Sequence, residues 1–330
     1  MERVDVLIVG AGPVGLAAGI EAKRRGLSVL LLDKGSVAHT VYRFPREITF
    51  FSESKKIEIG GHPLVSLGAK PTRQEALTYY RKVAEAEELP IETYTEALAI
   101  EGEEGAFQVL ARKRGRERVY EARFVVVATG YYDTPNRLGV PGEDLPHVLY
   151  SWEEAHPFYG QRVVVVGGSN SAVEAALHLF RAGARVILVH RGEWVRPSVK
   201  YWLLPDFENR VKEGAIEVRM RSRVLAITEE AVLLERDGVE ERLFVDFVLV
   251  QIGYRATDGL LRKAGVAYQG GKPLLTPEFE TSRRGLFAIG SCAFGPDTRS
   301  VFIENGRLHA QLALSAIRER LDRLGVSPYP

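Results

Sequence analysis

The turn Gly10-Ala11-Gly12-Pro13-Val14-Gly15 limits the fold of this chain more than any other segment. It follows an apolar, β-branched run at residues 4–9 and precedes a helical pattern at 16–25, after which residues 28–32 form a second apolar run. Glycines at these three positions permit a tight turn, let the backbone approach a pyrophosphate and let the helix lie close to the strand. The segment therefore predicts a β-α-β unit whose helix N-terminus binds a diphosphate.

Asp33 ends the second apolar run, near the position expected of an acid that binds ribose hydroxyls. A purely structural glycine turn is the alternative interpretation of the motif. The strand before the glycines and the helix after them favour nucleotide binding.

The same order of elements occurs a second time. An apolar run at 162–166 leads into the turn Gly167-Gly168-Ser169-Asn170-Ser171-Ala172, a helical pattern reaches residue 181, and another apolar run covers 185–189. Two such units predict two nucleotide-binding domains, each with its own dinucleotide.

The second unit has His190-Arg191 where the first has its acid. A carboxylate there would repel a 2′-phosphate, whereas arginine binds one through charge-assisted hydrogen bonds. The cofactor of this unit is therefore predicted to be NADPH rather than NADH, and Arg196 is expected to extend the same anion site. The alternative is that Arg191 is a solvated residue at the end of a strand.

Length and composition agree with two ordinary domains. The chain has 330 residues, and one domain takes about 150. With 44 basic and 43 acidic residues, no overall charge favours nucleic acid or an anionic membrane. No apolar run has the length of a membrane span, and the first strand begins too early for a signal peptide, so a cytoplasmic protein is expected.

Cys292 is the single cysteine of the sequence. It excludes an internal disulfide, a CxxC redox pair and a cysteine-rich zinc site, and the seven histidines form no pattern typical of a metal site. Because Cys292 follows Gly290 and Ser291 at the end of an apolar run, a buried structural thiol is expected, with a redox thiol as the alternative.

These motifs stand in an order that resembles the thioredoxin-reductase-like flavoproteins, and more closely the YpdA family of bacillithiol disulfide reductases. The closer resemblance covers nearly the whole chain. It is carried by Phe44-Pro45, Thr49-Phe50-Phe51-Ser52, Ile57-Glu58-Ile59-Gly60, Ala128-Thr129-Gly130-Tyr131-Tyr132, Glu154-Ala155-His156-Pro157, Pro197-Ser198 and Phe302-Ile303-Glu304-Asn305-Gly306.

The resemblance implies an α/β fold of two Rossmann-like domains, each with three layers of the ββα or αβα kind. An FAD domain would consist of residues 1–134 and 257–330, and an NADPH domain of residues 135–256 would be inserted into it. Dimers are usual in this family, so a homodimer is expected.

The resemblance also assigns the cofactor-binding residues. For FAD these would be Gly10, Gly12, Pro13, Gly15, Asp33, Lys34, Phe51, Ala97, Thr129, Gly130, Gly290 and Ser291. For NADPH they would be Gly167, Gly168, Ser169, Asn170, Ser171, His190, Arg191 and Arg196. The helix that begins near Glu304 would direct its N-terminus at the isoalloxazine ring, while core packing is the alternative role of Phe51.

The sequence departs from these relatives at three positions. The CxxC of thioredoxin reductases is absent, Val14 stands where the YpdA pattern often has cysteine, and Ser291 replaces the usual aspartate of the flavin motif. Ordinary thioredoxin reduction and a mixed disulfide at residue 14 are therefore excluded.

By the same resemblance, electrons would pass from NADPH through FAD to a low-molecular-weight disulfide such as oxidised bacillithiol. Lys200 and Arg196 would bind carboxylates of that substrate and Trp202 would shape the pocket, although these residues also fit a solvated surface. The hydride step requires no catalytic side chain, and the sequence identifies none. Two alternatives stay open: a reductase for a small electron-transfer protein of the ferredoxin or flavodoxin type, and a flavin-bound redox sensor.

Overall fold

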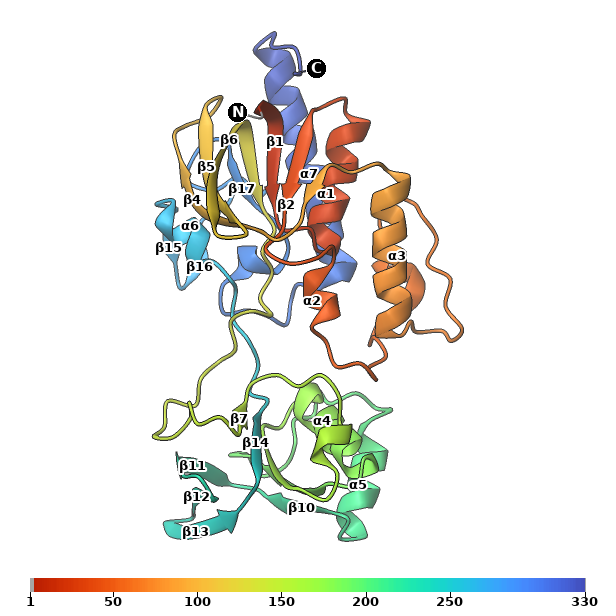
Figure 1. Ribbon diagram of the computed structural model, residues 1–330, viewed down its shortest axis with the longest axis vertical. Helices are drawn as coiled ribbons and strands as arrows, with labels where there is room; N and C mark the ends of the chain where they lie inside the picture. Colours follow the sequence, from red (N-terminus) through yellow and green to blue (C-terminus); the bar gives the residue numbers. More distant parts are fainter. Residues whose placement is uncertain (1–2, 330) are drawn as a thin grey trace. The chain divides into compact units, whose positions relative to one another are not determined.

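The computed structural model describes residues 3–329 and divides the chain into two compact units (Figure 1). The first unit combines Met1–Thr134 with Tyr254–Pro330, and the second is Pro135–Gly253. The chain therefore leaves the first unit once, builds the second, and returns.

The first unit is built on a seven-stranded sheet whose strand β6 has two roles. The first half of β6 pairs antiparallel with β5, while its second half lies between β1 and β17 in parallel. The strands of this sheet are β1 (Arg3–Val9), β2 (Val29–Leu32), β3 (Ile91–Glu92), β4 (Thr95–Glu101), β5 (Phe107–Lys113), β6 (Arg116–Val127) and β17 (Leu286–Ala288).

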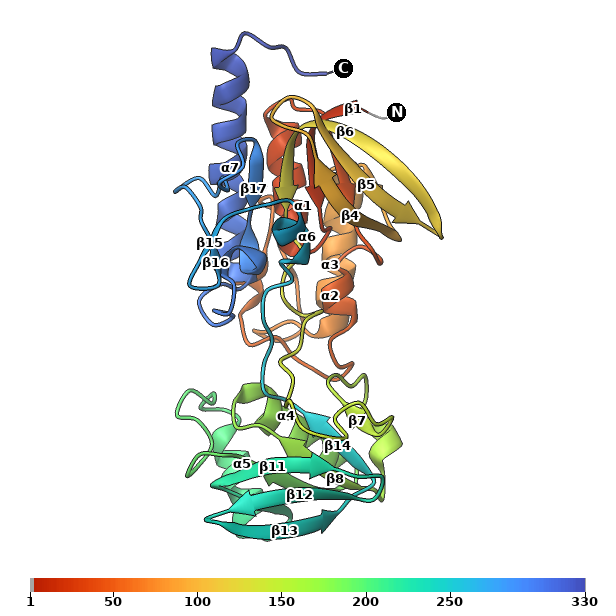
Figure 2. The ribbon, with the colours of Figure 1, turned by 90° about the vertical axis from the view of Figure 1, so that its left-hand side faces the viewer.

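Alternation along β1 supplies a core on each face of this sheet. Val6 and Ile8 face a cluster formed with helices α1 (Pro13–Arg24), α3 (Arg73–Ala86) and α7 (Ile303–Arg323). Leu7 and Val9 face a second cluster formed with β4, β5, β6 and the short helix α6 (Gly259–Lys263). Figure 2 shows the helices on one side and the β4–β5–β6 layer on the other, which is the predicted ββα arrangement.

The second unit repeats this design with a five-stranded parallel sheet in the order β10-β9-β8-β14-β7. Helices α4 and α5 pack on one face and an antiparallel three-stranded sheet, β11-β12-β13, covers the other. The elements are β7 (Val148–Leu149), β8 (Arg162–Val166), α4 (Asn170–Arg181), β9 (Arg185–Val189), α5 (Leu204–Lys212), β10 (Ile216–Arg219), β11 (Ser222–Ile227), β12 (Ala231–Arg236), β13 (Val239–Phe244) and β14 (Phe247–Val250).

Short elements complete the described chain. They are α2 (His39–Tyr42), the 3₁₀ helices η1 (Ser54–Ile57), η2 (His156–Phe158) and η3 (Gly290–Phe294), and the hairpin β15 (Tyr268–Gln269) with β16 (Lys272–Pro273).

The second boundary between the units differs from the sequence prediction. The chain re-enters the first unit at Tyr254, whereas the prediction placed this point at residue 257. The reason is local contact, because the Tyr254 ring stacks on Tyr132 at a centroid distance of 4.7 Å and the Arg255 N–H donates to the Thr134 carbonyl. Residues 254–256 therefore belong with the first unit.

Helix α1 begins earlier than its apolar pattern indicates, and the helix expected to begin near Glu304 begins one residue before it. Helix α1 starts at Pro13, since proline is well suited to a first helical position and the missing N–H costs nothing there. Helix α7 starts at Ile303, where the Asn305 side chain accepts a hydrogen bond from the Phe302 N–H. Polar and cyclic residues thus extend both helices beyond their apolar faces.

Candidate functional site

The first glycine turn joins β1 to α1, and two of its glycines are required by the protein's own packing. A Cβ on Gly10, whose φ is +112°, would lie 2.5 Å from the Ala128 carbonyl oxygen. A Cβ on Gly15 would lie 1.8 Å from the Gly10 carbonyl oxygen. Gly12 is different, because no heavy atom lies within 4 Å of its Cβ position. The turn therefore leaves open space at the N-terminus of α1, which fits the diphosphate of a dinucleotide.

Asp33 closes this turn from the end of β2. Its side chain is buried and accepts hydrogen bonds from the N–H groups of Ala11 at 2.7 Å and Gly35 at 2.8 Å. Burial raises the pKa of the Asp33 carboxyl, and the two backbone donors oppose that shift. Each carboxylate oxygen keeps a further lone pair for a ribose hydroxyl. The sequence motif predicted the ribose contact but not the contact with the turn.

Lys34 and Phe51 lie in surroundings that the sequence did not predict. The Lys34 ammonium group pairs with Asp133 at 2.8 Å, and the Arg43 guanidinium contacts the same carboxylate. Phe51 is half-buried, and the hydroxyl of its neighbour Ser52 donates to the carboxylate of Glu304 in the first turn of α7. The predicted flavin segment at 49–52 is thereby joined to the helix that was predicted to face the flavin.

The remaining predicted FAD residues lie at the ends of neighbouring strands. β1, β6 and β17 run parallel with Val9, Val127 and Ala288 in register, so Gly10, Thr129 and Gly290 follow at the same edge of the sheet.

Residues that follow β6 and β17 at this edge contact other residues of the first unit through backbone and side-chain groups. The Thr129 hydroxyl donates to the Thr257 carbonyl at 2.7 Å, and the Gly130 carbonyl accepts from the Thr257 N–H. The Ser291 hydroxyl lies 3.4 Å from the Val301 carbonyl. Ala97 is half-buried in the middle of β4, opposite Ala111.

The second glycine turn joins β8 to α4 and is closed by an imidazole. A Cβ on Gly167, whose φ is +150°, would lie 2.3 Å from the Gln251 carbonyl oxygen, and a Cβ on Gly168 would lie 2.5 Å from the His190 ring. Ser169 precedes the first turn of α4 and Ser171 is exposed in it. Ser169 stands at the position that Gly12 leaves open in the first turn, and the His190 ring lies against the preceding residue, Gly168.

The loop that carries the basic residues is held against this second turn. The Arg196 N–H donates to the Gly168 carbonyl at 2.7 Å, and the Asn170 side chain accepts from the Lys200 N–H at 2.8 Å. The pKa of His190 is lowered by burial and then by the charges of Arg196 and Arg191. Three cationic or titratable side chains therefore gather beside one helix N-terminus.

Cys292 has the properties of a structural thiol. It is fully buried in η3, and its sulfur donates to the carbonyls of Val127 at 3.3 Å and Ile289 at 3.2 Å. Burial raises the pKa of the Cys292 thiol, which opposes formation of the reactive thiolate.

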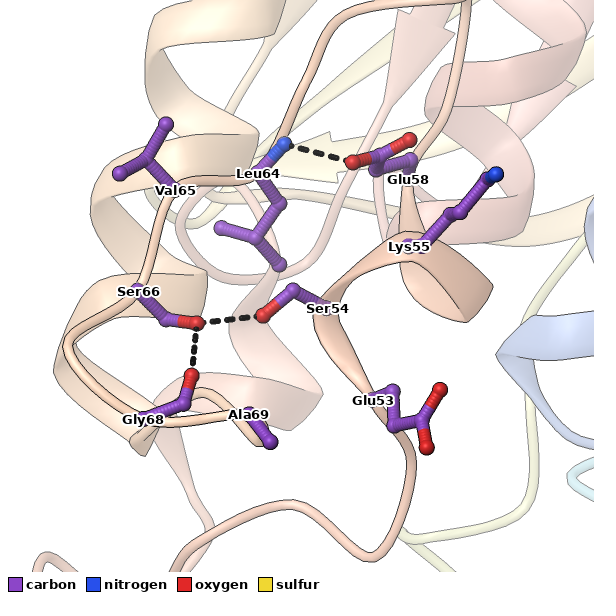
Figure 3. A pocket seen from close by; sticks show the side chains of 9 residues that line it. All are labelled: Glu53, Ser54, Lys55, Glu58, Leu64, Val65, Ser66, Gly68 and Ala69. Atoms are coloured by element: carbon purple, nitrogen blue, oxygen red, sulfur yellow. Dashed lines mark hydrogen bonds between the residues drawn. The ribbon is translucent and has the colours of Figure 1, made fainter.

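A shallow pocket lies beside this site in the first unit (Figure 3). The Ser54 and Ser66 hydroxyls are 2.5 Å apart across it, and the Leu64 N–H donates to the Glu58 carboxylate at 3.0 Å. None of the residues predicted to bind a cofactor lines it. Its lining residues are Glu53, Ser54, Lys55, Glu58, Leu64, Val65, Ser66, Gly68 and Ala69.

Sequence reasoning missed His309 of α7, whose ring accepts a hydrogen bond from the Gly290 N–H at 3.2 Å. Its spacing of three residues from Gly306 on one helix was the available signal. Within residues 3–329, no group of three potential ligands is arranged for a metal ion, and no helix has both the length and the apolar character to cross a bilayer.

Comparison with known proteins agrees with this geometry. The family model described as pyridine nucleotide-disulphide oxidoreductase matches residues 7–290. The bacilliredoxin reductase Bdr of Bacillus subtilis is 38% identical over 97% of this chain and 99% of its own length. The solved structure of the bacillithiol disulfide reductase Bdr (YpdA) from Bacillus cereus superposes with a TM-score of 0.94 at 38% identity, covering 97% of this chain and 100% of that one.

A more distant relative represents one of the alternatives. The ferredoxin–NADP reductase of Ignicoccus hospitalis is 29% identical over 95% of this chain and 98% of its own length.

These findings confirm the predicted two-domain Rossmann-like fold, the resemblance to the YpdA reductases and the assignment as an oxidoreductase that uses FAD and a nicotinamide dinucleotide. The chain belongs to the pyridine nucleotide-disulphide oxidoreductase family.

Proposed function

We propose that this enzyme uses NADPH to reduce a low-molecular-weight disulfide of the bacillithiol type, with FAD on the first unit and NADPH on the second. The observation that carries the proposal is the difference between the residues that lie against the two glycine turns. An aspartate lies against the first turn, and an imidazole beside two arginines lies against the second. The 38% identity over nearly the whole chain to the bacillithiol disulfide reductase Bdr (YpdA) of Bacillus cereus supports this class of acceptor. We also propose a cytoplasmic location and a homodimer, as is usual for such reductases.

The first unit offers what an FAD diphosphate and ribose require. The space above Gly12 admits the diphosphate, and the first-turn N–H groups of α1 have no acceptor within the helix. Asp33 keeps lone pairs for the ribose, and Gly130, Gly290 and Ser291 border the same sheet edge. When bound, FAD supplies the chemistry of accepting a hydride from NADPH and delivering two electrons onward.

The second unit has basic side chains that suit the 2′-phosphate of NADPH, a group that NADH lacks. The charges of Arg196 and Arg191 contribute to the lowered pKa of His190, which supports a positive region around the end of β9. A 2′-phosphate in this place would be held by charge-assisted hydrogen bonds. Gly167, Ser169 and Ser171 would contact the diphosphate at the start of α4.

The acceptor step proceeds without a protein dithiol. The only cysteine is buried and hydrogen-bonded to two carbonyls, so the chain forms no redox disulfide of its own. The balanced reaction is NADPH, a proton and the substrate disulfide giving NADP⁺ and two thiols. The substrate S–S bond breaks as it takes up the electron pair of the hydride, and its two sulfurs take up two protons, one equivalent to the hydrogen of that hydride and one from solution.

Lys200 and Trp202 remain candidates for contacts with an anionic substrate. The Lys200 ammonium group lies 5.8 Å from the Trp202 ring centroid, and Tyr201 packs edge-on against that ring at 4.9 Å. The loop does not move freely, since Val195 and Val199 are buried and the Lys200 N–H is bound by Asn170. The positive charge of Lys200 suits a substrate that carries carboxylates.

A second candidate acceptor is a small thiol-redox protein. The Bacillus subtilis relative is named a bacilliredoxin reductase, which describes a protein substrate. Both acceptors would be reduced through a disulfide, so the two hypotheses differ only in the size of the substrate.

The experiment that tests the proposal separates the two half-reactions. The purified protein is loaded with FAD, reduced with one equivalent of NADPH under anaerobic conditions, and mixed with bacillithiol disulfide, cystine, a bacillithiolated bacilliredoxin, ferredoxin or flavodoxin. We expect fast flavin reoxidation by bacillithiol disulfide or by the bacilliredoxin. Reoxidation only by ferredoxin or flavodoxin would contradict the disulfide assignment, and reduction without any reoxidation would favour a redox sensor.

A further inference from the structure

Helix α7 approaches the turn at Gly290 along one face. A Cβ on Gly306 would lie 3.2 Å from Val14 Cγ2 and 3.4 Å from Gly290 Cα, so the helix backbone packs closely against the turn at this residue. One helical turn later, on the same face, His309 Nδ1 accepts the Gly290 N–H at 3.2 Å. Gly306 and His309 thus act together on one backbone position.

The His309 ring is held rigidly in a buried site. It is 8% exposed and stacks on Phe279 with a centroid distance of 3.9 Å and an interplanar angle of 18°. The Phe294 ring lies 5.7 Å away on η3. Burial lowers the pKa of His309 to about 4, so the ring is neutral at physiological pH. Because Nδ1 accepts a hydrogen bond, the proton of the neutral ring is assigned to Nε2.

The Gly290 N–H depends on this ring. Gly290 begins η3 with a φ of +69°, a conformation that ordinary residues rarely adopt, and the N–H is buried. A Cβ at Gly290 would also lie 3.2 Å from Val14, so the turn is enclosed by α1, α7 and the imidazole. Removal of the acceptor would leave a buried donor without a partner in this turn.

We propose that His309 is a positioning residue for the turn Gly290-Ser291, and that through this turn it sets the affinity and the reduction potential of the flavin. The inference rests on the proposed function, which has FAD bound at this edge of the first unit. The His309 side chain acts through the lone pair of its neutral Nδ1, which accepts the Gly290 N–H. Stacking on Phe279 only orients the ring.

Two matched variants separate the hydrogen bond from the ring. His309→Phe keeps an aromatic ring beside Phe279 and removes the acceptor, whereas His309→Asn loses the ring but presents an amide oxygen near the place of Nδ1. A third variant, Phe279→Leu, removes the stacking partner and leaves the histidine. Each is measured for thermal stability, for FAD dissociation constant, and for the flavin absorbance maximum and midpoint potential.

We expect His309→Phe to weaken FAD binding at least tenfold and to shift the midpoint potential, while His309→Asn and Phe279→Leu stay within threefold of the wild type in affinity. A phenylalanine variant with normal affinity and potential would overturn the proposal. A folded asparagine variant as impaired as the phenylalanine one would overturn it too.

Variants that do not fold are also informative. If His309→Phe cannot be purified as a folded protein but His309→Asn can and binds FAD normally, the acceptor is needed for the turn and the proposal stands. If His309→Asn does not fold while His309→Phe does, the ring matters and the acceptor does not. Wild-type protein that binds no FAD would remove the proposed function itself, which is a different result from normal wild-type binding with an unaffected phenylalanine variant.

Discussion

The two glycine turns share one backbone design and differ in the side chain that closes them. Gly10 and Gly167 both have positive φ, and each would place a Cβ against a carbonyl at the end of a neighbouring strand, that of Ala128 in one unit and Gln251 in the other. The turns therefore position a helix N-terminus in the same way. The residues that distinguish one dinucleotide from another must therefore lie outside the glycine turns.

We propose that the residue at the end of the second strand of each unit provides that selectivity. Asp33 accepts the Ala11 N–H in the first turn, and the His190 ring covers Gly168, the equivalent position, in the second. In each unit the proposed selectivity residue lies against the glycine turn, and we propose that it also sets the charge beside the ribose. An acid suits a ribose with free hydroxyls, and a basic group suits a 2′-phosphate.

The largest expected effect distinguishes glycines required by packing from the glycine that leaves room for a ligand. Gly15→Ala would place a Cβ 1.8 Å from the Gly10 carbonyl oxygen, so we expect a loss of about 3 kcal/mol in unfolding free energy, as for severe overpacking. Gly12→Ala meets nothing within 4 Å, so stability should be unchanged while FAD affinity falls roughly tenfold or more. Thermal unfolding and FAD titration measure the two quantities.

The equivalent position of the second turn is already Ala172, and it provides the control. Ala172→Gly should have a much smaller effect on stability than Gly15→Ala. Equal losses for Gly12→Ala and Gly15→Ala in unfolding free energy would show that the first turn has no open space.

The next effect tests the charge at the second turn. Arg191→Ala and Arg196→Ala should each raise KM for NADPH roughly 10- to 100-fold, since a hydrogen bond to a charged group contributes about 1.5–3 kcal/mol. KM for NADH should change little. Arg185→Ala serves as the control, because Arg185 is exposed at the opposite end of β9. Parallel changes with both cofactors would contradict a role in binding the 2′-phosphate.

A smaller effect is expected from the protonation of His190. Its pKa is lowered in the free protein by burial and by Arg196 and Arg191, and a bound 2′-phosphate would neutralise those charges and raise the pKa. Binding of NADPH should therefore take up protons, and NADPH affinity should rise a few-fold as pH falls through the histidine range near 6.5.

Calorimetry in two buffers of different ionisation enthalpy measures this proton uptake. NADH, which lacks the 2′-phosphate, should cause much less uptake, and so should NADPH with the variant His190→Gln. Equal proton uptake with both cofactors would show that His190 does not sense the phosphate.

The local elements of both units were predictable from the sequence, whereas their long-range contacts were not. Both turns, their strands and their helices were predictable because glycine spacing and apolar runs are local signals. The contacts of Ser52 with Glu304 and of Gly290 with His309 were not, since nothing in the local pattern indicates which distant side chains meet. The boundary at Tyr254 was misplaced for the same reason, because it depends on stacking with Tyr132.

The smallest expected effect concerns Cys292. Both hypotheses about the acceptor assume that this buried thiol takes no part in the reaction. Cys292→Ser keeps a small side chain whose hydroxyl can donate to the carbonyls of Val127 and Ile289, so we expect NADPH-dependent disulfide reduction within about twofold of the wild type. Reduction of ferricyanide by NADPH provides the matched assay, because it requires flavin reduction and no thiol. Loss of disulfide reduction with normal ferricyanide reduction would show that the buried thiol takes part in the reaction, and the direct transfer from reduced flavin to the substrate disulfide would be wrong. If the variant retains both activities equally, electron transfer in this chain requires the cofactors bound at the two glycine turns and no thiol of the protein.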